Sequence, residues 1–380
     1  MPNQTKTFLV IVVIALAFFL VGAEAGWFNR SRPSKGAIFK VGAVMPFTGS
    51  ASIWGQENRE GIDLAVEELN KNGGVDNKQL QIVYDDTGSQ TTSAVSIMQK
   101  FVSEGYPIIL TSAYSQETLA EAPVAEKGKV LLLAAGSAAD KMRDAGDYVF
   151  RLKVSVNKEI ENLLGFVKNK NLKTIYILYA QIDYGVGSKK TVEELWPIMG
   201  GKIIGEEGFL PESTDFRAQL LKAKNARPDV ILLASALPKN LGYILKQAKE
   251  LNLNQKFIAP GGAVSPEIIT IAGSAADGLV YTMEFDINST STATKTFREN
   301  FNKRYGKDPE LFAAMGYDAA KIVAKMLKIC GPNSACLKDN LYQVQNYQGA
   351  SGIISFDDHG DVLKPMFYMT IKNGKFVRYE

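Results

Sequence analysis

Val41-Gly42-Ala43-Val44-Met45 is a short, almost wholly apolar run, and a helical pattern and a second apolar run follow it. The helical pattern places apolar residues at i, i+3, i+4 and i+7 over 62–69, and the second run covers 80–84. A continuous apolar run of this length is typical of a parallel strand that helices cover on both faces. The three segments predict a strand–helix–strand unit, the repeating element of an open parallel sheet.

The same alternation continues along the chain. Further apolar runs, each predicted as a strand, lie at 108–110, 130–133, 175–179, 230–233 and 257–259. Amphipathic helical patterns separate them, and the chain ends with helices predicted at 293–305 and 313–327 and a strand pair at 352–356 and 365–372. A chain of 380 residues can form two lobes that each bury a core. No Pro/Ser-rich linker divides it, which indicates several short crossings between the lobes rather than one tether.

The composition is that of a globular protein, with 46% hydrophobic and 22% charged residues. The net charge is only +3 and the basic residues form no dense cluster, so we expect no nucleic-acid partner. One histidine and two cysteines are too few for the common zinc sites, and we expect no metal and no cofactor.

Motifs of the main enzyme classes are missing. The sequence has no P-loop and no G-x-S-x-G, and the glycine-rich stretch 185–189 has the wrong spacing for a phosphate loop. The single histidine, His359, lies in a turn-forming stretch, where we expect it to be exposed to solvent. Asp85 and Asp86 end a predicted strand and are interpreted as solvated turn acids. The sequence therefore predicts no catalytic residues and no enzyme.

The N-terminus has the pattern of an export signal. An apolar run covers 8–21, which is short for a membrane span, and the small-x-small sequence Ala23-Glu24-Ala25 follows it. We predict a signal peptide over 1–25 that is removed after Ala25, a flexible lead-in over 26–36, and a mature protein in the periplasm. The alternative is an uncleaved N-terminal anchor.

Export places Cys330 and Cys336 in an oxidising compartment, where they can pair. The five residues between them include Gly-Pro and Asn-Ser, which favour turns and bring the two Cα atoms within disulfide range. A redox pair is the less favoured reading, because it requires C-x-x-C spacing.

In open α/β sheets, ligands bind beyond the carboxyl ends of the strands. The segments that follow the predicted strands offer hydroxyls, small residues and a few aromatics, and they lie at 46–55, 111–115, 134–138, 180–185 and 260–263. Ser115 opens a predicted helix and could offer its hydroxyl and free backbone N–H groups to a carboxylate. The alternative is that Ser115 and Ser137 are only helix N-caps.

Taken together, the motifs of the chain resemble the type I periplasmic solute-binding proteins of branched-chain amino acid ABC transporters. The resemblance covers essentially the whole mature chain and depends on the order and spacing of short motifs. These motifs are Val41-Gly42-Ala43, Thr48-Gly49, Trp54-Gly55, Gly61-Ile62-Asp63-Leu64-Ala65, Tyr84-Asp85-Asp86, Pro123-Val124-Ala125-Glu126, Asp183-Tyr184-Gly185, Tyr305-Gly306-Lys307, Tyr317-Asp318-Ala319, Phe356-Asp357 and Gly360-Asp361.

The resemblance implies an α/β fold of two Rossmann-like lobes with parallel sheets, joined by three hinge crossings. One lobe would comprise 37–154 with 284–350, and the other 155–283 with 351–380. The resemblance also implies a monomer that closes on a small carboxylate or amino acid between the lobes and delivers it to a membrane permease. A ligand-sensing ectodomain that reports to a signalling protein is the alternative role.

The resemblance further implies which residues contact the solute. Ser115 and Ser137 would hold its carboxylate and ammonium groups, with the backbone of Ala135 beside them, and Trp54 and Tyr184 would close over its apolar part. The full predicted set is Trp54, Tyr114, Ser115, Ala135, Gly136, Ser137, Tyr184 and Gly261.

Two positions depart from the family's pattern. The acid that pairs with the solute's ammonium falls at Gly261, and a further pocket aromatic falls near Ala236 or Leu237. A buried ammonium without a carboxylate partner is costly. Either another acid, such as Glu284 or Asp286, takes that role, or the solute is an aliphatic or aromatic carboxylate without an ammonium group.

Overall fold

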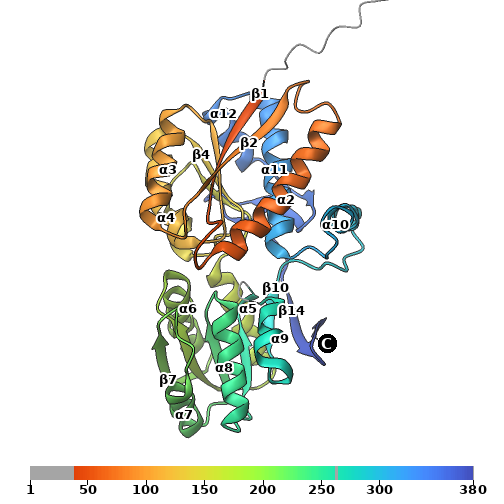
Figure 1. The fold of residues 1–380 in the computed structure, drawn as a ribbon. Helices are drawn as coiled ribbons and strands as arrows, with labels where there is room; N and C mark the ends of the chain where they lie inside the picture. The colour runs from red at the N-terminus through yellow and green to blue at the C-terminus, as the bar shows by residue number, and fades with distance from the viewer. Residues whose placement is uncertain (1–37, 262–263, 380) are drawn as a thin grey trace, which may run out of the picture.

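The computed structural model describes residues 38–261 and 264–379, and its apolar runs form two separate sheets, one in each of two lobes (Figure 1). The predicted signal peptide and lead-in lie outside the described residues. Within the described ranges, no helix is long and apolar enough to cross a membrane.

The sheet of the first lobe has five parallel strands in the order β2-β1-β3-β4-β5. These are β1 (Ile38–Met45), β2 (Gln79–Asp86), β3 (Ile108–Thr111), β4 (Leu131–Ala134) and β5 (Val149–Arg151). Helices α3 (Thr91–Ser103) and α4 (Ser115–Gly128) cover one face. The other face packs against α2 (Ser52–Lys71), α10 (Thr292–Tyr305), α11 (Leu311–Cys330) and α12 (Ser334–Tyr342). Because both faces are covered, the central strands β3 and β4 are buried along their whole length and almost wholly apolar, as predicted.

The sheet of the second lobe has seven strands in the order β15-β14-β10-β9-β8-β6-β7. The parallel strands are β6 (Thr174–Ala180), β7 (Lys202–Phe209), β8 (Val230–Ala234), β9 (Lys256–Ala259) and β10 (Val280–Met283). The antiparallel strands β14 (Phe367–Lys372) and β15 (Lys375–Arg378) extend one edge. Helices α5 (Val156–Asn169) and α6 (Asp183–Ile198) cover one face, and α7 (Arg217–Ala226), α8 (Pro238–Glu250) and α9 (Pro266–Ala272) cover the other.

The chain passes between the two sheets three times, within the segments 152–155, 284–291 and 364–366. The first segment joins β5 to α5, the second joins β10 to α10, and the third joins β13 (Val362–Leu363) to β14. The alternating pattern predicts the α/β fold with mainly parallel sheets, and the three crossings agree with what the family resemblance implies.

The third crossing differs from the prediction in position. Strands β11 (Tyr347–Gly349), β12 (Gly352–Phe356) and β13 form a small antiparallel sheet, and the apolar side chains of β12 and β13 pack into the core of the first lobe. The predicted boundary between 350 and 351 is therefore wrong, because 351–363 belong with the first lobe. The predicted pairing of 352–356 with 365–372 is also wrong, since β14 pairs with β10 and β15.

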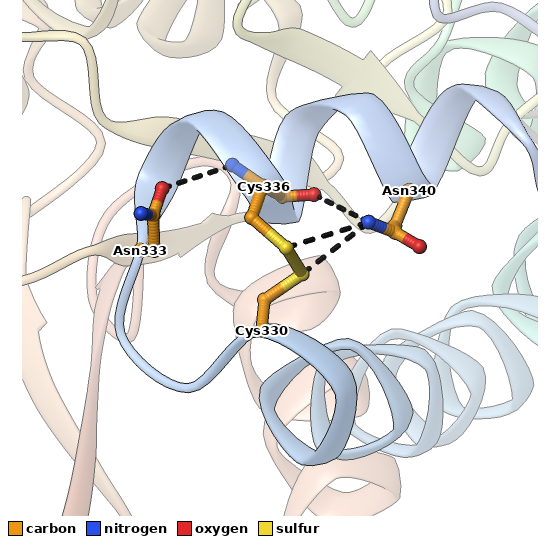
Figure 2. The surroundings of a disulfide bond; sticks show 4 residues. All are labelled: Cys330, Asn333, Cys336 and Asn340. Carbon is orange, nitrogen blue, oxygen red and sulfur yellow. Dashed lines mark hydrogen bonds between the residues drawn. A yellow bond between two sulfur atoms is a disulfide. The ribbon is translucent and has the colours of Figure 1, made fainter.

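Cys330 and Cys336 form a disulfide with a Cα–Cα distance of 5.6 Å, as predicted (Figure 2). The bond joins the last residue of α11 to the first turn of α12. The side chain of Asn333 caps α12 by accepting a hydrogen bond of 3.0 Å from the backbone N–H of Cys336. The Asn340 amide lies 3.4 Å from each sulfur. The disulfide therefore fixes a helix–turn–helix corner of the first lobe.

Candidate ligand-binding site

A hollow, here called the central cavity, lies between the lobes at the carboxyl ends of the strands. The first lobe contributes most of its lining: Trp54, Ala113, Tyr114, Ser115, Gln116, Gly136, Ala138 and Phe312. The second lobe contributes Ile182, Tyr184 and Ala236. Lys153, on the first crossing, completes the lining. Both lobes thus contribute to one mostly apolar hollow, as a small-molecule site requires.

Three aromatic side chains form the wall on the first lobe. The ring of Trp54 lies 6.0 Å from that of Tyr114 and 6.3 Å from that of Phe312, measured between centroids. Gly136 allows Phe312 to approach, because a Cβ at that position would lie 2.7 Å from the Phe312 ring. The wall is suited to the apolar part of a solute.

Asp86 organises the loop that leads to Trp54. Its carboxylate accepts hydrogen bonds from the backbone N–H groups of Phe47, Thr48 and Gly88, and from the Thr48 hydroxyl. Partial burial raises the pKa of Asp86, but these hydrogen bonds outweigh it and hold the pKa below its usual value. Asp86 is thus a loop-organising residue rather than only a solvated turn acid.

Ser115 is the first residue of α4 and lines the central cavity. It is not the N-cap, which is Tyr114. Its hydroxyl oxygen accepts hydrogen bonds of 3.3 Å from the backbone N–H groups of Ala138 and Ala139, which ties α4 to the segment after β4. The hydroxyl and the first turn of a helix together can bind a carboxylate.

Tyr184 reaches the central cavity from the second lobe, where it lies in the first turn of α6. Its hydroxyl donates a 2.7 Å hydrogen bond to Oε2 of Glu159. Glu159 is buried in the first turn of α5, and its other oxygen, Oε1, accepts a hydrogen bond from Lys153. The aromatic residue on the second side of the cavity is therefore connected to the first crossing.

Each of the three crossings contributes one buried charge to a connected cluster, here called the crossing cluster. Its members are Lys153, Glu159, Glu284, Lys364, Ser351 and Asp318. Nζ of Lys153 lies 2.8 Å from Oε1 of Glu284, and Nζ of Lys364 lies 3.8 Å from Oε2 of Glu284. Lys364 also donates to Ser351, whose hydroxyl donates to Asp318 at 2.6 Å.

Opposing effects set the ionisation of the crossing cluster. Burial lowers the pKa of Lys153, but the carboxylates of Glu159 and Glu284 outweigh it and raise that pKa above its usual value. Burial raises the pKa of Glu159 despite the neighbouring Lys153. Burial also lowers the pKa of Lys364. The two carboxylates therefore hold Lys153 in its charged form.

Three of the predicted contact residues do not line the central cavity, namely Ala135, Ser137 and Gly261. Ala135 is buried in the core of the first lobe. Ser137 is fully buried, its hydroxyl lies 2.5 Å from that of Thr118, and it donates to the carbonyl oxygen of Ser112. The sequence could not reveal that Ser137 is buried outside the cavity, because the direction of its side chain depends on the packing of α4 against β4.

Gly261 lines a larger neighbouring hollow, here called the outer cavity. A Cβ on Gly261 would lie 1.8 Å from the carbonyl oxygen of Thr282, so an acid at this position would require β10 to move. Of the two predicted substitutes, Asp286 lines the outer cavity, whereas Glu284 lines neither cavity and is held by Lys153.

Gln116, Lys153 and Phe312 line the central cavity and were not predicted from the sequence, and neither was Glu159, which contacts Lys153 and Tyr184. A signal for Lys153 was present, because a lysine stands between Leu152 and Val154, directly after a strand. Phe312 had none, since its helix lies far along the chain and reaches the site only through tertiary packing. No group of three or more side chains suited to hold a metal ion occurs in 38–261 or 264–379.

The sequence profile of the family described as periplasmic binding protein matches residues 39–375 of this chain. The leucine-, isoleucine-, valine-, threonine- and alanine-binding protein of Pseudomonas aeruginosa is 28% identical over 375 residues, which cover 95% of this chain and 94% of that protein.

Two solved structures are similar in fold and sequence. The leucine-binding protein LivK of Thermotoga maritima superposes with a TM-score of 0.84 at 28% identity, covering 90% of this chain and 97% of that one. LivJ of Streptococcus pneumoniae, solved with isoleucine, has a TM-score of 0.82 at 28% identity, covering 89% and 97%. These matches confirm the resemblance that the motifs indicated.

The match spans both lobes and the cavity between them, and the matched family consists of solute-binding receptors that act outside the cytoplasm. The chain belongs to the periplasmic binding protein family, and the relatives that it matches over almost their whole length include branched-chain amino acid receptors of that family.

Proposed function

We propose that this chain is the periplasmic solute receptor of an ABC importer and that it binds a small carboxylate with an apolar remainder in the central cavity. The observation that carries the proposal is the lining itself, in which Trp54, Tyr114 and Phe312 face Tyr184 from the opposite lobe. The names of the relatives support a solute of the branched-chain amino acid class or one of similar shape.

The proposed mechanism is closure on the solute. The carboxylate binds at Ser115 and the start of α4, and the apolar part lies between the aromatic wall and Tyr184. A solute that contacts both lobes stabilises the closed state by its contacts with each side, and only that state is recognised by a permease. The chain acts as a monomer after its signal peptide is removed, and it performs no chemical step.

A thermal-shift screen tests the proposal. The panel is leucine, isoleucine, valine, α-ketoisocaproate and benzoate, with leucinamide as the matched control that lacks a carboxylate. We expect at least one carboxylate to raise the melting temperature and leucinamide to leave it unchanged, because a ligand stabilises the state it binds. A panel without any stabilising carboxylate, or equal stabilisation by leucinamide, would refute it.

A further inference from the structure

Lys153 is the only residue with a formal charge that lines the central cavity in the described part of the chain. Its side chain is 2% exposed, and it lies on the first crossing between the two lobes. No aspartate or glutamate lines the same cavity within the described ranges. A buried cation beside a solute is a strong determinant of which charges the solute can carry.

The contacts of Lys153 leave it one donor to offer. An ammonium group has three N–H donors. In the described structure two of them have acceptors, which are Oε1 of Glu159 and Oε1 of Glu284. The remaining donor has no protein acceptor among the described residues, so it is available to an oxygen atom of a solute.

Glu159 and Tyr184 make the same region unsuitable for a solute ammonium. If Gly261 carried a Cβ atom, that atom would lie 3.7 Å from Oε1 of Glu159. The carboxylate of Glu159 therefore lies close to Gly261. Both oxygens of Glu159 already have donors, Oε1 from Lys153 and Oε2 from Tyr184. A second ammonium would lie beside the like charge of Lys153 and would have to share Glu159 with the two donors that it already has, and no carboxylate among the described residues lines the cavity.

We propose that Lys153 occupies the place of a solute ammonium, and that the preferred solute is an apolar carboxylate with an oxygen acceptor beside the carboxylate and no ammonium group. An α-keto acid has this chemistry, because its keto oxygen can accept the third N–H of Lys153. This inference rests on the proposed function and narrows its solute class.

Calorimetric titration of one matched pair tests the inference in the wild-type protein. Leucine and α-ketoisocaproate share a side chain and a carboxylate and differ in the ammonium. We expect α-ketoisocaproate to bind at least roughly tenfold more tightly, the effect of one hydrogen bond to a charged group. Tighter binding of leucine would overturn the inference and leave the proposed function intact, whereas no binding of either, or of any carboxylate in the panel, would overturn both.

The variant Lys153→Met then tests whether Lys153 itself sets the preference between the two solutes. We expect it to weaken binding of α-ketoisocaproate by roughly tenfold and to reduce its advantage over leucine. Lys364→Met is the matched control, because Lys364 belongs to the same buried cluster but does not line the cavity. An unchanged ratio of the two affinities in Lys153→Met, or the same change in Lys364→Met, would show that Lys153 acts only through the fold.

Lys153→Met can fail to fold, because it leaves Glu159 without its cation. The double variant Lys153→Met/Glu159→Gln removes both charges and keeps an acceptor for Tyr184. The same loss of preference is expected in this variant, and a retained preference would contradict the proposal.

Discussion

Nζ of Lys153 lies 2.8 Å from Oε1 of Glu284, so the first and second crossings between the lobes are joined by a buried ion pair. The same Glu284 lies within reach of Lys364 on the third crossing. Charges on all three connections thus meet at one place, next to the central cavity.

Glu284→Gln should reduce the free energy of unfolding by about 3 kcal/mol, because it removes one of the two carboxylates paired with buried Lys153 and the carboxylate that is paired with buried Lys364. Urea denaturation measures this loss. The matched control is Glu161→Gln, which breaks an exposed pair with Lys158 and should cost less than about 1 kcal/mol. Equal effects of the two substitutions would mean that the crossing cluster does not stabilise the fold.

Ser115→Ala and Ser137→Ala should separate binding from stability. Ser115 lines the cavity, so its loss should weaken carboxylate binding about fivefold to tenfold by calorimetry, and it should also cost about 1 kcal/mol of stability because the N–H groups of Ala138 and Ala139 lose their acceptor. Ser137 is buried and hydrogen-bonded within the first lobe, so its loss should cost about 1 kcal/mol of stability and leave the affinity unchanged. The reverse outcome would exchange the roles assigned to the two serines.

Stability should depend on the ionisation of Glu117, which is buried in α4 and accepts a hydrogen bond from Thr87. Burial raises the pKa of Glu117 from 4.5 to about 7. The folded state therefore holds the proton more tightly than the unfolded state does, and the contribution of Glu117 to stability falls as the pH rises from about 4.5 to about 7.

Glu117→Gln keeps the shape and the acceptor but cannot ionise. We expect its unfolding free energy to fall less than that of the wild type between about pH 5 and pH 8, and its melting temperature to be higher at the upper end. Glu161→Gln, at an exposed position, is the control, and its unfolding free energy should change with pH as that of the wild type does. If the unfolding free energy of Glu117→Gln changed with pH in the same way as that of the wild type, Glu117 would be charged in the folded protein throughout this range.

Removing the disulfide by Cys330→Ser/Cys336→Ser should lower the free energy of unfolding by about 2 kcal/mol, since the bond closes a short loop in the unfolded chain. Solute affinity should not change. Phe312, which lines the cavity, and Cys330 lie near opposite ends of α11, about 27 Å apart by helical rise. Weakened binding in the double variant would show that the corner is coupled to the cavity.

Hydrophobic periodicity predicted the fold because both faces of each sheet are covered, which leaves continuous apolar strands such as β3 and β8 in the sequence. The third crossing was misplaced because β12 has the pattern of a strand of either lobe, and only its packing against the first core decides between them. The same limit applies to the site. Four of the five segments predicted after the strands contribute residues to the central cavity, whereas Gly261 of the fifth lines the outer cavity. Whether Ser115 or Ser137 lines the central cavity depends on side-chain directions that periodicity does not encode.

The crystal structure of the protein with the carboxylate that stabilises it most tests the central claim most directly. We predict density for the solute in the central cavity, with its carboxylate at Ser115 and the start of α4 and its apolar part between Trp54 and Tyr184. A solute seated in the outer cavity, or bound to one lobe without contact to the other, would contradict the account.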